Sequence, residues 1–529
     1  MDLLWNKSEG IIKKISVQQK IAFIGALIAG FLSHGYALGN NYIYHDATIL
    51  NGLGTTFGLG RWALGYVGMI DDLLLGNYNL PFLNVVLSII LIAVSAMVVI
   101  DILEVDGKFL SAFIGAVFAV YPVVTSTFAY NFSATFYFIA LLLSVVAIKV
   151  MKDGVNEKKI KACIVAALLI ALSAGFYQAY LSVSVTLALT LVMMELISDK
   201  ANNNDNEAKS GSMISPIVKG IIYAITLIAG LVIYLIINTI SNAIMKPPAT
   251  GYQGAEDMGS MSFAKIPARF IQTYLHFFYI KWNGINKAMC MWLFIIAFII
   301  IAAFVIISGL AKNKVKKANI LLFILCLALM PIAVNLVYLM STSENFSVHT
   351  LMRFATVFVL ITPAVLMEKM KRDESVPAVI ASILLIAITF GYIYSNNIAY
   401  LKMNLVQEEM TSFFTVLETR ISQVEGYSDE TPIIFVGESK IVDNNLYDLN
   451  EVYKDTVILG YEYNATDLIN KESWKRYMAY HAGFAPDIIN VIDAPESILN
   501  SEELANLSVY PDADSIAIID GTIVVKLSE

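Results

Sequence analysis

Residues 81–102 read PFLNVVLSIILIAVSAMVVIDI, an apolar stretch in which Asp101 is the one charged residue. A run of about 20 apolar residues is long enough to cross the hydrocarbon core of a bilayer as an α-helix. Similar runs recur along the first three quarters of the chain, near residues 20–38, 109–128, 132–150, 160–177, 179–197, 217–240, 289–311, 318–340, 351–367 and 376–395. The sequence therefore predicts a polytopic α-helical membrane protein with about eleven transmembrane helices.

The composition of the whole chain agrees with this fold class. Only 15% of the 529 residues are charged and the mean hydropathy is +0.68, which is far from a soluble globular composition. No basic patch interleaved with aromatic residues indicates nucleic-acid binding. Cys163, Cys290 and Cys326 lie in or beside apolar runs, at spacings that indicate neither a metal site nor a disulfide framework, so we interpret them as buried apolar residues.

The basic residues of the connecting segments predict the orientation in the membrane. With the N-terminus in the cytoplasm, Lys and Arg are concentrated in the inner segments, as the positive-inside rule expects. An odd number of spans then places the C-terminus outside the cell. The first apolar run ends without a small-residue cleavage site, so we expect it to stay as a membrane anchor. We therefore expect a multi-pass protein of the cytoplasmic membrane with an extracytoplasmic C-terminal domain.

This orientation places two long loops, residues 39–80 and 241–288, on the outer face. Long loops on a rigid scaffold commonly carry binding and catalytic residues. Within the first loop, residues 58–75 are rich in aromatic and aliphatic side chains with few charges. We predict that they form a helix lying in the outer membrane interface, as an anchor or as a lid over the bundle.

The chain changes character after residue 395, so we divide it into a transmembrane domain, 1–395, and a small extracytoplasmic α/β domain, 396–529. The second domain is predicted to open with an amphipathic helix over 404–424. Strands follow near 432–437, 456–459, 488–492, 515–519 and 522–526, with helices near 465–480 and 495–506. Asp520-Gly521 lies between the last two strands and is a strong two-residue hairpin signal.

The first outer loop holds the most informative polar residues, Tyr44-His45-Asp46 and then Gly60-Arg61-Trp62. Charge beside lipid is costly unless it has a partner or water. The Asp46 carboxylate is suited to act as a general base on an acceptor hydroxyl. His45 is suited to orient that carboxylate or to bind sugar hydroxyls, and Arg61 to hold a phosphate. An N-cap is the alternative for Asp46, because it precedes Ala-Thr-Ile-Leu.

Further polar residues are predicted on the same face. Tyr177 and Gln178 occupy a tight outer turn and suit sugar binding, with an aromatic-belt tyrosine beside a polar turn residue as the alternative. Asp71 and Asp72 form a second acidic or metal site, or else a solvated turn. His276 lies in an aromatic segment that lines a sugar or lipid groove, or is a structural histidine in a packed helix.

Lys281 and Arg353 are additional candidates for stabilising a leaving phosphate, ranked after Arg61. Arg353 begins a span, so snorkelling to the headgroups is its ordinary explanation.

The order and spacing of these motifs, with the topology, resemble the serotype-converting O-antigen glucosyltransferase family, which belongs to the GT-C class of polytopic membrane glycosyltransferases. The resemblance rests on Asn41-Tyr42-Ile43-Tyr44-His45-Asp46, Gly60-Arg61-Trp62 and Phe176-Tyr177-Gln178, and extends to the strand Ile433-Ile-Phe-Val-Gly437. The family is expected to carry an acidic pair in the first outer loop. Here His45 replaces the first acid, which weakens any two-carboxylate metal site.

The resemblance implies transfer of a hexose, with glucose as the candidate, from a polyprenyl-phosphate donor to a cell-surface polysaccharide on the outer face of the membrane. The transfer is expected to invert the anomeric centre, with Asp46 as the catalytic base. The implied substrate-binding residues are His45, Arg61, Tyr177, Gln178, His276, Lys281 and Arg353. No cofactor is required, and a divalent metal is left open. A separate polyprenyl-phosphate sugar synthase and a flippase are the implied pathway partners.

A flippase or transporter of lipid-linked glycan is the main alternative. A transporter is expected to show charged or broken segments near mid-membrane and an internal repeat. Here the mid-span regions are almost free of charge and no matching halves are found, which favours chemistry at the outer surface. A receptor with an extracellular α/β sensor is a third interpretation, but anchoring such a sensor needs far fewer spans.

Overall fold

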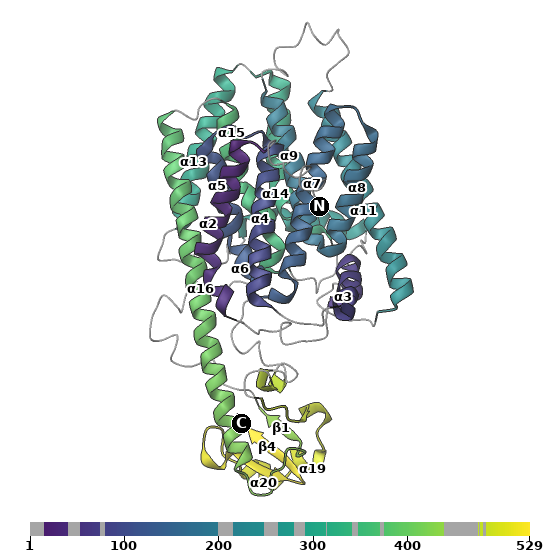
Figure 1. Ribbon diagram of the computed structural model, residues 1–529, viewed down its shortest axis with the longest axis vertical. Coiled ribbons are helices and arrows are strands. Elements are labelled where there is room, and N and C mark those ends of the chain that lie inside the picture. Colours follow the sequence, from purple (N-terminus) through teal and green to yellow (C-terminus); the bar gives the residue numbers. More distant parts are fainter. Residues whose placement is uncertain are drawn as a thin grey trace, which may run out of the picture. The chain divides into compact units, whose positions relative to one another are not determined.

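The computed structural model describes residues 15–40, 53–74, 80–198, 215–247, 263–279, 291–313, 315–340, 348–370, 375–437, 474–475, 477–479 and 483–528 (Figure 1). The chain forms two compact units that divide between Asn397 and Ile398. The first is a bundle of long helices, and the second combines helices with a small sheet. The predicted site residues His45, Asp46 and Lys281 lie outside the described residues.

The bundle contains ten described helical stretches that are long and apolar enough to cross a membrane, together with a shorter apolar helix, α8. Each falls on one of the apolar runs of the sequence, so the prediction of a polytopic helical membrane protein is confirmed. The elements are α2 (Val17–Gly39), α4 (Pro81–Leu103), α5 (Lys108–Val120), α6 (Pro122–Phe128), α7 (Asn131–Asn156), α8 (Ile160–Phe176), η3 (Gln178–Tyr180), α9 (Leu181–Ile197), α11 (Pro216–Met245), α13 (Met291–Lys312), α14 (Lys317–Val334), η8 (Leu336–Leu339), η9 (Thr350–Val357), α15 (Phe358–Lys369) and α16 (Val376–Ser422).

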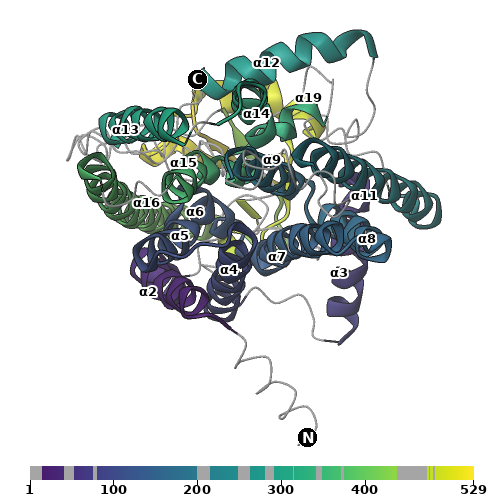
Figure 2. The same ribbon diagram turned by 90° about the horizontal axis from the view of Figure 1, so that it is seen from above.

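The first helices of the bundle pack closely because small residues meet between them. A Cβ atom added to Gly115 of α5 would overlap the Ala22 carbonyl of α2, and one added to Gly25 would lie 2.9 Å from the carbonyl oxygen of Ala112. Small residues let helix backbones approach each other, and van der Waals packing of this kind is a main source of helix association in lipid. Figure 2 shows α2, α4 and α5 side by side as a result.

Three predicted spans are interrupted toward the same end of the bundle, and a fourth, α8, ends there. α5 stops at Tyr121 (φ −57°, ψ 132°), because the residue before a proline avoids the helical region and Pro122 follows. α8 stops at the extended Tyr177 (φ −158°, ψ 108°), and α14 stops at Asn335 (φ −109°, ψ 21°). η9 is broken at Arg353 (φ −105°, ψ 24°). Non-helical backbone at membrane depth is tolerated where protein buries it or where it lines a polar cavity.

We call this end of the bundle the arginine end, because Arg61 and Arg353 both lie there. Two shorter segments add to it: η2 (Leu53–Leu59) with α3 (Trp62–Leu74), and η6 (Phe263–Lys265) with α12 (Ile266–Tyr279). Figure 1 shows α3 at the lower end of the bundle. The helix predicted over 58–75 is therefore present, and it starts after a 3-10 turn.

The opposite ends of the helices carry ion pairs. Lys152 Nζ lies 2.6 Å from Glu104 Oε1, and Lys219 Nζ lies 2.6 Å from Glu195 Oε1. Burial opposes ionisation of Glu104, but the hydrogen bond and charge of Lys152, together with the charges of Lys369 and Lys149, lower the pKa of that carboxyl. This end of the bundle is the one that the distribution of basic residues assigns to the cytoplasm.

The last membrane helix continues without a break into the second unit. The helix predicted over 404–424 is present, but it is not an element of its own, because α16 runs uninterrupted from Val376 to Ser422 and includes the predicted span 376–395. No Gly or Pro occurs between Gly391 and Gly426, so nothing in the sequence ends the helix earlier. The chain then leaves the helix and turns at Gly426, which has a φ of +88°.

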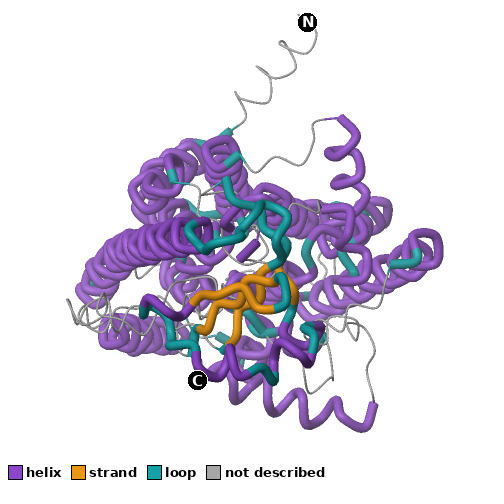
Figure 3. Tube along the Cα trace, turned by 90° about the horizontal axis from the view of Figure 1, so that it is seen from below, coloured by secondary structure: helices purple, strands orange, loops and turns teal. Residues whose placement is uncertain are grey.

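The second unit contains a four-stranded sheet in the order β2-β1-β4-β3 (Figure 3). Its strands are β1 (Ile433–Val436), β2 (Ile488–Ile489), β3 (Ile516–Ile519) and β4 (Thr522–Lys526). β1 pairs in parallel with β2 and β4, and β3 pairs antiparallel with β4. Asp520 and Gly521 join the last two strands with φ angles of 49° and 74°, as a type I′ hairpin requires, so that prediction is confirmed.

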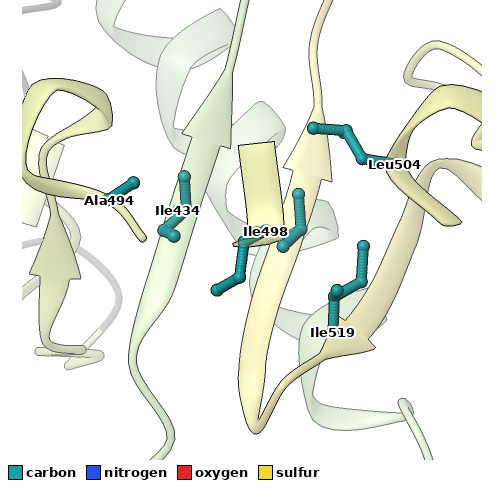
Figure 4. Close-up of a cluster of buried hydrophobic side chains, with 6 residues drawn as sticks. Ile434, Ala494, Ile498, Leu504 and Ile519 are labelled. Carbon is teal, nitrogen blue, oxygen red and sulfur yellow. The ribbon is translucent and has the colours of Figure 1, made fainter. Parts of the chain in front are cut away.

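Short helices cover one face of this sheet: η11 (Val491–Asp493), α19 (Glu496–Leu499) and α20 (Glu502–Asn506), with η12 (Ala513–Ser515) before β3. Ile498 and Leu504 of these helices pack against Ile434, Ile519 and Val524 of the strands (Figure 4). The predicted strand over 488–492 is shorter than expected, because the chain turns into η11 after Ile489. The predicted strand 456–459 lies outside the described residues, and the helix near 465–480 is described only at 474–475 and 477–479.

Candidate active site

Arg61 is presented by a turn that only glycine fits. Gly60 precedes it with a φ of +71°, in the left-handed region that side chains rarely adopt. A Cβ atom at Gly60 would also lie 2.6 Å from the hydroxyl of Tyr234 and 2.8 Å from Nε2 of Gln178. The turn therefore has neither the conformation nor the space for another residue.

Two buried polar side chains hold this turn in place. The Tyr234 hydroxyl donates a hydrogen bond to the Gly60 carbonyl at 2.9 Å. Gln178 Nε2 donates to the Leu59 carbonyl at 2.8 Å and to the Tyr234 hydroxyl at 3.1 Å. The amide nitrogen of Gln178 is thus used to position the turn, and direct contact of Gln178 with a sugar stays a prediction.

The Arg61 side chain lies among tyrosines. Its Nη1 donates a 2.8 Å hydrogen bond to the Tyr137 hydroxyl, and its guanidinium carbon lies 5.0 Å from the ring centroid of Tyr177 and 5.6 Å from that of Tyr137. The two rings stack on each other at 4.1 Å. Cation–π and phenol contacts of this kind stabilise and orient a guanidinium.

Arg353 has a similar setting on η9. Its Nη2 donates to the Tyr338 hydroxyl at 2.7 Å and to the Val348 carbonyl at 3.2 Å, and its guanidinium lies 5.7 Å from the Tyr338 ring centroid. No carboxylate pairs with Arg353 in the part of the chain that the structure describes. The side chain is therefore held by neutral groups of the protein rather than extended toward lipid headgroups.

The predicted site residue His276, on α12, stacks on Tyr338, the tyrosine that binds Arg353. Its ring lies 4.6 Å from the Tyr338 ring and is tilted by 8°. Partial burial, and then the positive charges of Arg353 and Arg269, lower the pKa of His276. The imidazole is consequently neutral at neutral pH and is able to accept as well as donate a hydrogen bond.

A chain of aromatic rings connects the surroundings of Arg61 with those of Arg353. Tyr177, which packs against Arg61, lies 5.6 Å from Tyr180, and Tyr180 lies 5.9 Å from Phe354, the neighbour of Arg353 in sequence. Tyr180 lies in η3 and Phe354 in η9, and these two segments contact each other. The structure therefore gathers Arg61, Tyr177, Gln178, His276 and Arg353 at one end of the bundle, from segments far apart in the sequence.

Asp71 and Asp72 lie in the last turn of α3 rather than in a loop. Partial burial, and then the charge of Asp72, raise the pKa of Asp71. Among the described residues, no group of three or more His, Cys, Asp or Glu side chains could hold a metal ion. The assignment of these two carboxyls as a second acidic site stays a prediction.

Three tyrosines of this region, unlike Tyr177, were not predicted from the sequence. Tyr137, Tyr234 and Tyr338 all use their hydroxyls to bind Arg61, the Gly60 turn or Arg353. Each lies inside or at the edge of an apolar run, where a tyrosine is ordinarily explained as an aromatic-belt residue. A phenol buried among apolar side chains usually needs a partner, and this is the signal that could have pointed to them.

The family model described as Glucosyl transferase GtrII matches residues 35–360, which is more than half of the chain. The chain belongs to this glucosyl transferase family. The match confirms the resemblance and covers every described residue of the candidate site, whereas α16 and the second unit, to which the resemblance was extended, lie beyond it. No curated protein and no solved structure matches the chain. With its membrane helices, the protein is a polytopic membrane glycosyltransferase.

Alanine at Gly60 is expected to lower glycosyl transfer at least about tenfold, because the left-handed conformation costs roughly 1–2 kcal/mol and the Cβ atom would displace Gln178 and Tyr234. The matched control is Gly35→Ala in α2, where an added Cβ atom has no neighbour within 4 Å and the change should be neutral or stabilising. Transfer rate and melting temperature of both purified variants test this. Full activity of Gly60→Ala would show that the Arg61 turn is not part of the site.

Proposed function

We propose that this glycosyltransferase moves a hexose from a polyprenyl-phosphate donor to a cell-surface glycan, at the outer face of the cytoplasmic membrane. The proposal adopts the GT-C class of mechanism, in which the lipid donor needs no nucleotide site. Glucose is the hexose that the family description favours. Asp46 would serve as the general base, and the arginine end would be the outer end of the bundle.

One observation carries this proposal: a membrane bundle holds two arginines at one end with phenol hydroxyls and aromatic faces. In the described structure the partners of Arg353 are Tyr338 and a backbone carbonyl, and no carboxylate pairs with it. A cation near lipid that the protein does not itself neutralise favours an anionic ligand. A polyprenyl phosphate is anionic and lipid-bound, so it meets both requirements.

The proposed reaction needs a base on one side of the sugar and cations on the other. Asp46 accepts the proton of the acceptor hydroxyl while its oxygen forms a bond to the anomeric carbon. The bond from that carbon to the phosphate oxygen breaks with inversion, and polyprenyl phosphate leaves with the bonding electrons. Charge grows on the phosphate in the transition state, where Arg61 and Arg353 would stabilise it by forked hydrogen bonds.

The outer orientation is supported by the position of the ion-paired lysines. Lys149, Lys152 and Lys219 lie toward the end of the bundle opposite to the arginines, as expected for the cytoplasmic side. A donor used on the outer face has to be made and moved across the membrane first. The proposal therefore includes a polyprenyl-phosphate sugar synthase and a flippase as separate partners.

The donor class is tested with purified wild-type protein in proteoliposomes. Labelled hexose is supplied either on polyprenyl phosphate or on a nucleotide, together with a purified surface glycan. We expect label to enter the glycan from the lipid donor alone. Transfer from the nucleotide sugar alone would overturn the proposed donor, and movement of lipid-linked sugar across the bilayer without transfer would favour the flippase function.

A further inference from the structure

Among the described residues of the bundle, the buried polar atoms without a hydrogen-bond partner lie in one half. In the described part of the first unit, all of them lie toward the arginine end, and none lies among the ion-paired ends opposite. They include side-chain atoms of Trp62, Thr125, Ser126, Asn131, Tyr180, Ser182, Asn238, Asn242 and Asn335. An unsatisfied buried polar group costs free energy, and such groups are few in native proteins unless they serve a ligand or another function.

Asn335 is the most informative of these residues. Its side chain is fully buried, at 0% exposure, and neither its Nδ2 nor its Oδ1 has a hydrogen-bond partner. It stands at the break between α14 and η8, three residues before Tyr338, whose hydroxyl accepts the hydrogen bond of Arg353. α14 is thus interrupted at a residue whose side-chain amide is buried and forms no hydrogen bond within the protein.

Tyr180 offers a second unused group on a neighbouring segment. It is 1% exposed, its hydroxyl has no partner, and its ring lies between Tyr177 and Phe354 in the chain of rings that connects the two arginine settings. The η3 segment of Tyr180 contacts η8, which follows Asn335 directly. The two side chains therefore come from adjoining segments between Arg61 and Arg353.

The hydrogen-bond donors and acceptors of Asn335 and Tyr180 indicate which part of the donor they bind. The carboxamide of Asn335 offers both donors and an acceptor, and the phenol of Tyr180 offers one donor and an acceptor. A phosphate diester can only accept hydrogen bonds, so it would leave the Asn335 oxygen unsatisfied. A sugar hydroxyl both donates and accepts, and it would satisfy both residues.

We propose that Asn335 and Tyr180 form a subsite for hydroxyl groups of the transferred hexose, inside the bundle and between the two arginines. This inference rests on the proposed function, and it adds the part of the donor that these neutral residues recognise. Arg61 and Arg353 bind the phosphate, whereas Asn335 and Tyr180 distinguish a sugar-bearing lipid from the bare lipid phosphate.

The test compares two probes on the full-length protein in detergent: polyprenyl-phosphate glucose and polyprenyl phosphate without sugar. Ligand-induced thermal stabilisation gives the apparent affinity for each. We expect the wild type to bind the sugar-bearing lipid more tightly. Asn335→Leu and Tyr180→Phe should each weaken binding of the sugar-bearing lipid about tenfold and leave binding of the bare lipid unchanged.

Two control variants separate ligand binding from a structural role. Tyr223→Phe makes the same change at a buried tyrosine away from the arginine end and should bind both lipids normally. Asn396→Leu removes an amide that donates to Ser33 Oγ and to the Val120 carbonyl, so it should lower the melting temperature. Asn335→Leu should not lower the melting temperature, because it removes an amide that has no partner.

Three outcomes would overturn the subsite. They are equal affinity of the wild type for the two lipids, an equal loss of both affinities in Asn335→Leu, and a loss of melting temperature in Asn335→Leu as large as in Asn396→Leu. The proposed function is tested by a separate measurement, the transfer of labelled glucose by the wild type. A wild type that prefers the sugar-bearing lipid without transferring its sugar would leave the subsite standing and overturn the transfer reaction.

Discussion

Asparagine in place of Asp46 is expected to lower glycosyl transfer by at least about a hundredfold, because an amide cannot take the proton of the attacking hydroxyl. Asparagine is as good a helix N-cap as aspartate, so this variant removes the base and keeps a cap if residue 46 has one. Wild type and Asp46→Asn are compared at equal membrane level, with labelled polyprenyl-phosphate hexose as donor. The rate should fall while donor binding changes little, because the base acts on the acceptor.

The matched controls are Asp71→Asn and Asp72→Asn on α3, which remove the other carboxyls of the segment 39–80. Both variants should transfer at nearly the wild-type rate. Normal transfer by Asp46→Asn, together with loss in either control, would move the catalytic carboxylate to α3. Asp46 would then be a cap.

Removal of either arginine of the site should have an effect of similar size. Arg61→Met and Arg353→Met are each expected to lower the rate of transfer about 100-fold to 1,000-fold, the loss typical when one group that stabilises transition-state charge is removed. Lysine at either position keeps the charge but loses the forked geometry and much of the packing on tyrosine. The lysine variants should therefore fall between methionine and wild type.

Each methionine variant also removes a hydrogen bond to Tyr137 or Tyr338, so folding has to be followed by melting temperature. Arg269→Met on α12 is the matched control, because it removes an arginine near the same region that contacts Gln272 rather than either tyrosine. Equal losses in all three variants would indicate a general effect of surface charge. Full activity of both Arg61→Met and Arg353→Met would exclude them from phosphate binding.

The membrane part of the fold could be predicted closely because length and hydropathy decide it. Every apolar run became a helix at the predicted place, including the short α8 and the interrupted α14. The continuity of α16 was missed, since the change from apolar to polar composition near residue 396 was interpreted as the boundary between two domains. Hydropathy indicates whether a helix lies in lipid or in water, whereas Gly and Pro indicate where a helix ends. No Gly or Pro occurs between Gly391 and Gly426.

The candidate site was less accessible to prediction. Residues that stand out by charge or by motif, such as Arg61 and Arg353, were found, and the structure places both at one end of the bundle. Their tyrosine partners and Asn335 could not be singled out, because a polar residue inside an apolar run gives no sign of whether its hydrogen bonds are made. That is decided by where the helices end or break, and no proline directly follows Tyr177 or Asn335, although Pro331 lies in the last turn of α14.

The interrupted segments at the arginine end are joined to one another by hydrogen bonds. Tyr121 bonds to Thr356 at 2.6 Å, and Thr356 in turn donates to the Arg353 carbonyl at 2.6 Å, so the broken segments fix one another. Segments held in this way position the groups of the site before a substrate arrives.

The most direct test of the central claim, that the arginine end faces outward and carries the chemistry, is transfer in sealed vesicles of defined orientation. Right-side-out and inverted vesicles are loaded with labelled polyprenyl-phosphate hexose, and a glycan acceptor that cannot cross the membrane is added outside. Product is predicted in right-side-out vesicles, and none where Asp46→Asn replaces the wild type. Product in inverted vesicles alone would contradict the account, because it would place the chemistry at the ion-paired end of the bundle.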